Sequence, residues 1–302
     1  MKPAENTTVA EQQVIAVQGD VHYYSKALPN TRMAAGLYDM SAVRVGNEIL
    51  PGFTPVAVTN DEPLDIDTTI ADILKEFQDF FDRRPIFKKL GFAHKRGYLL
   101  HGPPGCGKSS TLRLLQKQFL EKYQGIIIFW RAGAHIKNYV EHIRKYEPER
   151  PVMVICEDID GFVQHFEEKI LEFLDGQQGL DNFLLVATTN NLKVVPDRIK
   201  NRPSRIDRVL EIGKPTRQTR EKYLLALKVD PQEAASLALR TEGMTIAQLK
   251  EVVVATVCLG QTLESVLERL NVTLEKSPEA ADEKDPEWPD DGDDPMNEMM
   301  SG

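Results

Sequence analysis

The chain has 302 residues, of which 41% are hydrophobic and 27% are charged, and its formal charge is −9. These values are those of a globular protein with a sizeable core, and they exclude small disulfide scaffolds and wholly disordered chains. Residues 277–302 contain ten acidic residues against Lys284 alone, so residues 1–276 sum to zero charge, and this neutral body argues against nucleic acid as a partner.

Residues 1–60 predict a small β-rich N-terminal segment, which we interpret as an adaptor. Its short apolar stretches are separated by glycines and prolines, including Pro51 and Gly52, as is usual between short strands; they lie at 14–17, 22–24, 37–40 and 43–45. From residue 65 onward apolar residues recur at helical spacing, with Asp67 placed to cap the helix, and the helix leads to Pro85.

Residues 61–214 predict an α/β core. Four near-continuous apolar runs alternate with helical patterns, at 97–101, 126–130, 152–156 and 183–187. Strands of this kind, alternating with helices, form a parallel sheet covered on both faces. The intervening helices are expected from residue 108, at 136–146 and at 166–174. The fold class is therefore α/β, with a three-layer αβα arrangement around a parallel sheet.

Residues 215–275 predict a separate helical lid, because no convincing strand follows Pro215. Residues 276–302 combine prolines and acids and predict a disordered acidic tail. Such a tail is either only solubilising, or a docking or autoinhibitory peptide with Trp288 and the nearby methionines as apolar anchors.

Residues 102–109 read GPPGCGKS, which satisfies the phosphate-loop pattern G-x-x-x-x-G-K-S between a strand and a helix. Here we expect backbone N–H groups to cradle the phosphates of ATP, Lys108 to reach the β and γ oxygens, and the Ser109 hydroxyl to bind Mg²⁺. No part of this chemistry needs the thiol of Cys106, which we interpret as a small loop residue. The predicted nucleotide-binding residues are Gly102, Pro103, Pro104, Gly105, Cys106, Gly107, Lys108, Ser109 and Ser110.

Two further strands end in polar residues at the same edge of the predicted sheet. Glu157 and Asp158 follow the strand at 152–156, and we expect one carboxylate to hold Mg²⁺ and the other to orient or deprotonate the attacking water. Asp160 either joins them or caps the next helix. Asn190 follows the strand at 183–187 and either holds the same water or belongs to a turn.

Residues 196–208 contain five basic residues. Arg202 and Arg205 flank a Pro-Ser turn, which aims two guanidinium groups from one corner. A solvated basic face and a nucleic-acid contact remain alternatives. The geometry also suits a γ-phosphate that is bound by a neighbouring subunit.

Together these motifs resemble the AAA family of ATPases within the AAA+ class of P-loop NTPases. The resemblance covers residues 61–274 and rests on four ordered segments: FKKLGFAHKRGYLLHGPPGCGKSS, VMVICEDID, ATTN and NRPSRIDR. It implies a homo-oligomeric ring, usually a hexamer, with ATP at the subunit interfaces. It also implies that Arg202 and Arg205 are arginine fingers acting in trans, that Glu157 binds Mg²⁺ and that Asp158 handles the water.

The sequence departs from the family pattern in three places. The Glu-Asp order at 157–158 is similar to the order in the subgroup that contains the mitochondrial translocase of the folded Rieske protein, which acts in cytochrome bc1 assembly. This chain lacks the membrane helix of that translocase. The shorter Asp158 is expected to slow hydrolysis or to shift the water. Residues 130–151 lack the aromatic pore loop of family members that thread polypeptides, and no His-Glu-x-x-His zinc-protease motif is present.

Three functions fit these observations. The first is a chaperone-like ATPase that remodels or moves an unidentified protein substrate or adaptor. The second is an ATP-dependent switch or loader acting with DNA or a replication partner, and the third is a low-turnover ATP-binding scaffold. Three scattered cysteines and the lack of a signal peptide or membrane span predict a cytoplasmic location with no membrane partner.

Overall fold

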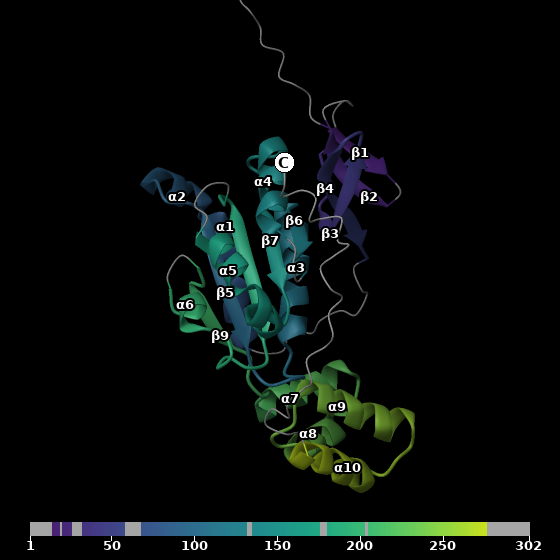
Figure 1. Ribbon diagram of the computed structural model, residues 1–302. Helices are drawn as coiled ribbons and strands as arrows, with labels where there is room; N and C mark the ends of the chain where they lie inside the picture. Colours follow the sequence, from purple (N-terminus) through teal and green to yellow (C-terminus); the bar gives the residue numbers. More distant parts are fainter. Residues whose placement is uncertain are drawn as a thin grey trace, which may run out of the picture.

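The computed structural model describes residues 14–18, 20–25, 32–57, 68–131, 135–175, 180–202 and 205–276 (Figure 1). The predicted helix cap at Asp67, the Pro-Ser turn at 203–204 and the tail at 277–302 lie outside these described residues.

One nine-stranded sheet organises the molecule, with strand order β1-β2-β4-β3-β6-β7-β8-β5-β9. Its parallel half consists of β5 (Lys95–His101), β6 (Ile126–Phe129), β7 (Val152–Cys156), β8 (Phe183–Thr189) and β9 (Arg208–Glu211). All residues of β7 and β8 are buried, as expected for strands covered on both faces. The predicted α/β fold with a parallel sheet is confirmed.

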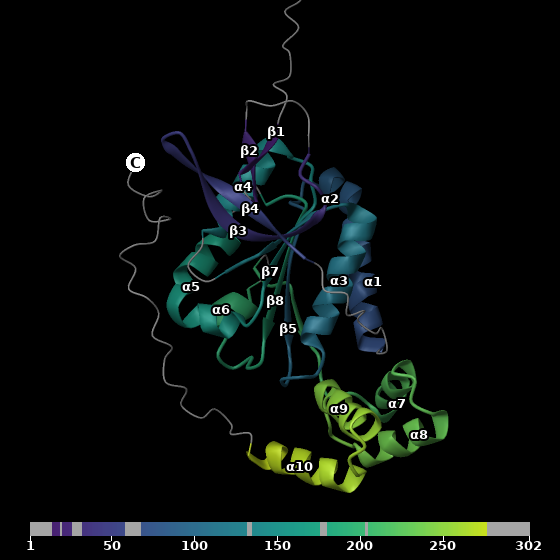
Figure 2. The same cartoon turned by 90° about the vertical axis from the view of Figure 1, so that its right-hand side faces the viewer.

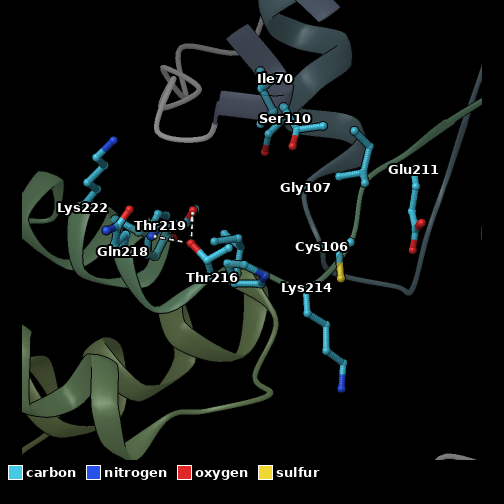
Figure 3. A pocket seen from close by; sticks show the side chains of 16 residues that line it. Ile70, Cys106, Gly107, Ser110, Glu211, Lys214, Thr216, Gln218, Thr219 and Lys222 are labelled. Carbon is cyan, nitrogen blue, oxygen red and sulfur yellow. Dashed lines mark hydrogen bonds between the residues drawn. The ribbon is translucent and has the colours of Figure 1, made fainter. Parts of the chain in front are cut away.

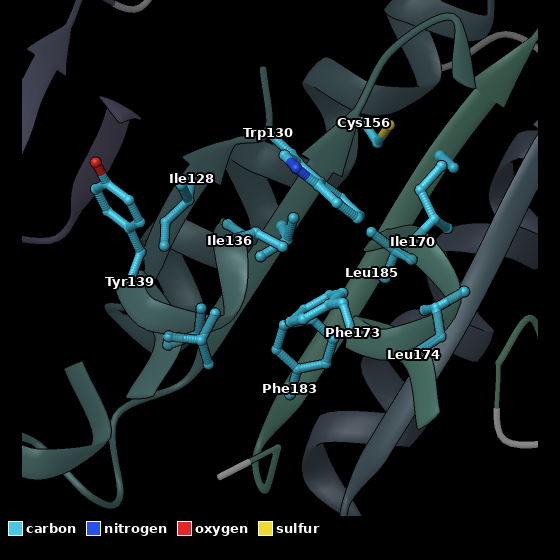
Figure 4. Close-up of a cluster of buried hydrophobic side chains, with 14 of the residues drawn as sticks. Ile128, Trp130, Ile136, Tyr139, Cys156, Ile170, Phe173, Leu174, Phe183 and Leu185 are labelled. Carbon is cyan, nitrogen blue, oxygen red and sulfur yellow. The ribbon is translucent and has the colours of Figure 1, made fainter. Parts of the chain in front are cut away.

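Helices cover both faces of this parallel half (Figure 2). On one face α1 (Thr68–Asp82) and α3 (Lys108–Tyr123) pack on the sheet. The short helix α2 (Arg84–Leu90) follows α1 in the chain. On the other face lie α4 (Ile136–Tyr146) and α5 (Ile159–Asp175), whose side chains meet Trp130 and the strands in a second buried cluster (Figure 4). The α6 helix (Asp197–Lys200) follows β8.

Three details of the α/β core differ from the sequence prediction. Helix α5 begins at Ile159 and has non-helical dihedrals at Phe166, where the sequence predicted its start. Strand β9 was not predicted, because it is a four-residue edge strand whose residues are mostly exposed. The helix that leads to Pro85 ends at Asp82, and Pro85 lies in the first turn of α2, where a proline is tolerated.

The N-terminal strands continue the same sheet. Strands β1 (Val14–Gln18), β2 (Val21–Ser25), β4 (Glu48–Val56) and β3 (Gly36–Val45) are antiparallel, and β3 then pairs in parallel with β6. The two stretches at 37–40 and 43–45 are one strand. The expectation that Pro51 and Gly52 separate strands is wrong, since both lie inside β4, where a Cβ on Gly52 would come 2.5 Å from the side chain of Val21.

Residues 217–276 are helical, as predicted. They form α7 (Arg217–Ala226), α8 (Pro231–Arg240), α9 (Ile246–Val253), the π-helical turn η1 (Val254–Cys258) and α10 (Leu263–Lys276), which share a hydrophobic core of their own. Side chains of Thr216, Asp230 and Thr245 cap the first three helices. Within the described part of the chain, no helix is both long and apolar enough to cross a membrane.

Candidate nucleotide-binding site

The loop between β5 and α3 has the backbone shape of an anion cradle. Three of its glycines adopt positive φ: Gly102 (154°), Gly105 (76°) and Gly107 (112°). A Cβ on Gly102 would lie 2.0 Å from the carbonyl oxygen of Ile212, so only glycine fits there. The glycines of the predicted phosphate loop are therefore required by the path of the chain.

The N-terminus of α3 opens onto this loop. The first bond of its helical ladder runs from the N–H of Thr111 to the carbonyl of Gly107, at 2.9 Å. The N–H groups of residues 107–110 precede that ladder, and no side chain caps the helix at Gly107. Four N–H groups at a positive helix end fit a phosphate group.

Lys108 connects two of the predicted motifs. Its buried ammonium donates to the carbonyl oxygens of Gly102 (2.7 Å) and Pro103 (3.1 Å) and to Oδ1 of Asn190 (2.6 Å). Burial lowers the pKa of Lys108, while the nearby Cys106 and the acids after β7 act in the opposite direction. The lysine is thus held in a poorly solvated place by oxygen acceptors that a phosphate can replace.

Asn190 links Lys108 to the acidic residues that follow β7. Its Nδ2 donates to Oδ1 of Asp158 at 3.3 Å, and the backbone N–H of Asp158 donates to the hydroxyl of Thr188 at 3.0 Å. Asp158 has a φ of 51°, a left-handed conformation uncommon outside glycine, which turns the chain at the end of β7. The structure therefore joins Lys108, Asn190 and Asp158 in one hydrogen-bonded chain.

Asp160 lies in the first turn of α5, which begins at Ile159. It is therefore not the N-cap residue, and the capping alternative is wrong for this side chain. An acid in the first helical turn is still favoured by the helix dipole.

Two adjoining cavities surround the loop. The larger, about 550 Å³, includes Ser109, Glu157 and Asp158 from the core and Lys250 from α9. The smaller, about 310 Å³, lies between the loop and α7 (Figure 3). Gly107, Ser110, Tyr223 and Ile246 line both cavities. Their combined size and mixed lining suit a ligand as large as a nucleotide.

The donor set in the larger cavity also fits Mg²⁺. The Ser109 hydroxyl and the Glu157 carboxylate are exposed to this cavity from neighbouring elements, and hard oxygen atoms are the ligands that Mg²⁺ prefers. Among the described residues, no cluster of three or more His, Cys, Asp or Glu side chains suits another metal site.

The helical lid touches the phosphate loop directly. The N–H of Ala247, in the first turn of α9, donates to the carbonyl of Gly105 at 3.1 Å. A Cβ on Gly105 would lie 2.9 Å from the Cβ of Ala247, so this contact also depends on glycine. The lid therefore forms one wall of the nucleotide site.

The two arginines predicted as fingers have different environments, and neither lines either of the two cavities described above. Arg202 is exposed, whereas the side chain of Arg205 is only 5% exposed. Arg205 donates to both carboxylate oxygens of Asp175, at 2.6 and 2.5 Å, and to the carbonyl of Arg198. The donors of Arg205 are thus engaged within its own chain, whereas the role of either arginine as a finger acting in trans stays a prediction.

Several lining residues were missed at the level of sequence. Arg113 lies one turn after Ser109 on α3, a spacing that would have indicated it. Tyr223 and Lys250 come from the lid, and Asp175 meets Arg205 across 30 residues. Only the tertiary structure brings Tyr223 and Lys250 to the cavity and Asp175 to Arg205.

Comparison with known proteins agrees with this geometry. Residues 98–214 match the sequence model of the family described as "ATPase family associated with various cellular activities (AAA)". The ATP-dependent zinc metalloprotease FtsH of Marinobacter nauticus is 28% identical over 65% of this chain and 34% of its own length. The proteasome-activating nucleotidase of Aeropyrum pernix is 29% identical over 56% of this chain and 47% of its own length.

A third relative, the cell division cycle protein 48 homolog of Archaeoglobus fulgidus, is 22% identical over 92% of this chain and 44% of its own length. The chain spans less than half the length of each of these relatives. The family match covers the phosphate loop, both acids, Asn190 and the arginine corner. Residues 98–214 therefore match an AAA family ATPase domain of the P-loop NTPase type, with homologues among AAA+ proteins.

Proposed function

We propose that this protein hydrolyses ATP with Mg²⁺ at the subunit interfaces of a homo-oligomeric, hexameric ring, and that it uses the energy to remodel or move a protein partner. The observation that carries the proposal is the hydrogen-bonded chain Lys108–Asn190–Asp158 beside the open N-terminus of α3. A purely structural loop would not need a buried lysine linked to an acid through an amide.

In this proposal each residue has a separate task. The N–H groups of residues 107–110 and the ammonium of Lys108 bind the phosphates. Ser109 and Glu157 would hold Mg²⁺, which would supply positive charge against the phosphates when bound. Because Lys108 exchanges the oxygen of Asn190 for phosphate oxygens, the amide of Asn190 becomes available to orient a water, and Asp158 accepts its proton.

Arg202 is the proposed arginine finger, since its exposed guanidinium is open to the γ-phosphate of a neighbouring subunit. Arg205 is proposed as a positioning residue. Its bonds to Asp175 and to the carbonyl of Arg198 fix the chain on both sides of Arg202. In this proposal Arg202 contacts the γ-phosphate, and Arg205 holds Arg202 in position.

A protein partner is favoured by two observations. The body of the chain is neutral, which does not suit a DNA loader, and a similar protein is named a proteasome-activating nucleotidase. The Glu157–Asp158 order supports a closer relation to the Rieske-protein translocase subgroup. The three free cysteines support a cytoplasmic location. A low-turnover scaffold is the alternative that the short Asp158 favours.

The test is ATP turnover against protein concentration, with particle mass measured on the same samples with and without ATP. Wild type, Lys108→Ala and Arg202→Ala are compared. Turnover that rises with assembly and is lost in both variants, while Arg202→Ala still binds ATP, supports the interface mechanism. Binding without turnover in an assembled wild type would instead indicate the scaffold.

A further inference from the structure

The outer surface of α2 has no role in the proposed function, although its composition is unusual. Ile86, Leu90 and Phe92 are 51%, 61% and 65% exposed, and Lys88 and Lys89 lie among them. We call these five residues the α2 patch. Since α2 leads to the first residue of β5, the patch lies at the opposite end of the parallel strands from the nucleotide cavities (Figure 1).

The inner side of α2 is held firmly in place. Phe87 packs against the rings of Phe80 and His94, with centroids 5.8 and 4.9 Å apart. Arg84 forms ion pairs with Glu149 and Asp181, both at 2.7 Å. The patch is therefore a fixed feature of the fold, and a fixed group of exposed apolar side chains marks an interaction surface.

The sequence after α10 has the complementary chemistry. Residues 277–302 contain ten acids against one lysine, together with Trp288 and the cluster Met296, Met299 and Met300. Lys89 forms no ion pair within the described part of the chain, and Lys88 shares only the exposed Glu149. An acidic segment with aromatic and thioether anchors matches a surface of exposed lysines and large apolar side chains.

The length of this segment is sufficient to reach the patch. The 26 residues after Lys276 (302 − 276) extend to about 86 Å at ~3.3 Å per residue. A compact domain of this size is roughly 50 Å across, from its expected radius of gyration of about 18 Å. The methionine cluster near the end of the chain can therefore reach α2 from the lid.

We propose that residues 277–302 dock on the α2 patch of their own chain, with the methionines and Trp288 against Ile86, Leu90 and Phe92. The acids of the segment then face Lys88 and Lys89. The lid also exposes apolar side chains, Leu239 (54%) and Val257 (59%). Of the arginines near these side chains, Arg240 pairs with Glu264 and Arg269 with Glu251, whereas the lid lysines Lys222, Lys228 and Lys250 are exposed, so the lid is the competing surface that the control below tests.

The test uses fluorescence of the full chain, which has two tryptophans. Trp130 is buried in the core, so the difference between wild type and Trp288→Phe isolates the emission of Trp288. With a local tail concentration near 1 mM and a weak site of about 0.1 mM, roughly nine-tenths of tails are docked. Acrylamide should then quench Trp288 about five- to tenfold less in the full chain than in a peptide of residues 277–302.

The double variant Leu90→Ser/Phe92→Ser should raise the quenching of Trp288 to the value of the free peptide. Lys88→Glu/Lys89→Glu, or added salt, should raise it part of the way. The matched control is Leu239→Ser/Val257→Ser, which removes two equally exposed apolar side chains from the lid and should change nothing.

Four results would overturn the proposal. Trp288 in the wild type could be quenched as strongly as the free peptide, or the lid control could release it as the patch variant does. Patch variants could also change the particle mass and leave Trp288 unaffected, which would identify the patch as an interface between copies. Protection that persists on dilution supports docking within one chain, and protection lost on dilution contradicts it.

Discussion

The nucleotide edge, formed by Lys108, Ser109 and Glu157, and the arginine corner, formed by Arg202 and Arg205, are two charged regions of this molecule that differ in which side chains are already engaged. At the nucleotide edge Lys108 is engaged, while Ser109 and Glu157 remain open to the cavity. At the corner Arg205 is engaged by Asp175 and Arg202 is open. We infer that the exposed side chains bind a ligand or a neighbouring subunit, and that the hydrogen-bonded side chains fix the positions of the exposed ones.

The largest effect is expected for Arg202→Ala. Loss of an arginine finger lowers turnover by about 10³-fold or more. Because this side chain is exposed, the melting temperature and ATP affinity should stay at their wild-type values. Steady-state turnover, a fluorescent nucleotide titration and calorimetry measure the three quantities. Wild-type turnover in an assembled Arg202→Ala would show that this open group is not the finger.

Lys108→Ala should weaken nucleotide binding and lower turnover. Loss of a charged group that stabilises the transferred phosphoryl is expected to lower turnover by about 10²- to 10³-fold. Lys193→Ala, which removes an exposed lysine from the loop after β8, is the matched control and should behave as wild type. Retained ATP affinity in Lys108→Ala would place the phosphate elsewhere in the cavity.

Arg205→Ala should act mainly through stability. Removing one partner of a buried ion pair costs about 3–5 kcal/mol, but the Asp175 side chain is 46% exposed, so about 1–2 kcal/mol is expected after discounting for solvent. At roughly 2–4 °C per kcal/mol this lowers the melting temperature by several degrees.

Asp175→Asn sharpens this comparison, because it keeps the shape and removes the charge that holds Arg205. It should lower turnover at a fixed degree of assembly without changing ATP affinity, by a smaller factor than Arg202→Ala. If Asp175→Asn instead abolished ATP binding, the corner and the nucleotide edge could not be separate units.

The smallest effect is a change of ATP affinity with pH. Lys108 binds phosphate as a cation, and burial lowers its pKa. It therefore loses its proton at a lower pH than an ordinary lysine, whose pKa is about 10.4, and the affinity for ATP should fall as the pH rises toward that value. Titrations between neutral pH and pH 10 measure it, and Lys108→Arg should remove the dependence.

The parallel half of the sheet was predictable from the sequence because its strands are buried on both faces. Strand β7 has no exposed residue, so its sequence is a continuous apolar run with a clear end at Glu157. Strand β9 escaped prediction for the opposite reason, since exposed edge residues such as Arg208 and Glu211 leave no apolar signal. Strand β4 was missed because Pro51 and Gly52 are read as breakers.

The candidate site divides in the same way. The phosphate loop depends on local backbone shape, and its residues could be named from one short pattern that includes Gly107 and Lys108. The state of Arg205 could not be predicted, because Asp175 belongs to another element and no local pattern announces the pair. Tertiary packing determines which of the two similar arginines is exposed and which is buried.

The parallel pairing of β3 with β6 also determines how the chain can be shortened. Residues Ile126, Ile127 and Ile128 of β6 are fully buried, and β3 covers their open side. Removal of the N-terminal strands would leave this apolar strand as an unpaired edge of the sheet, and such edges promote aggregation. The N-terminal strands therefore protect this edge of the parallel sheet, and a chain without them should aggregate.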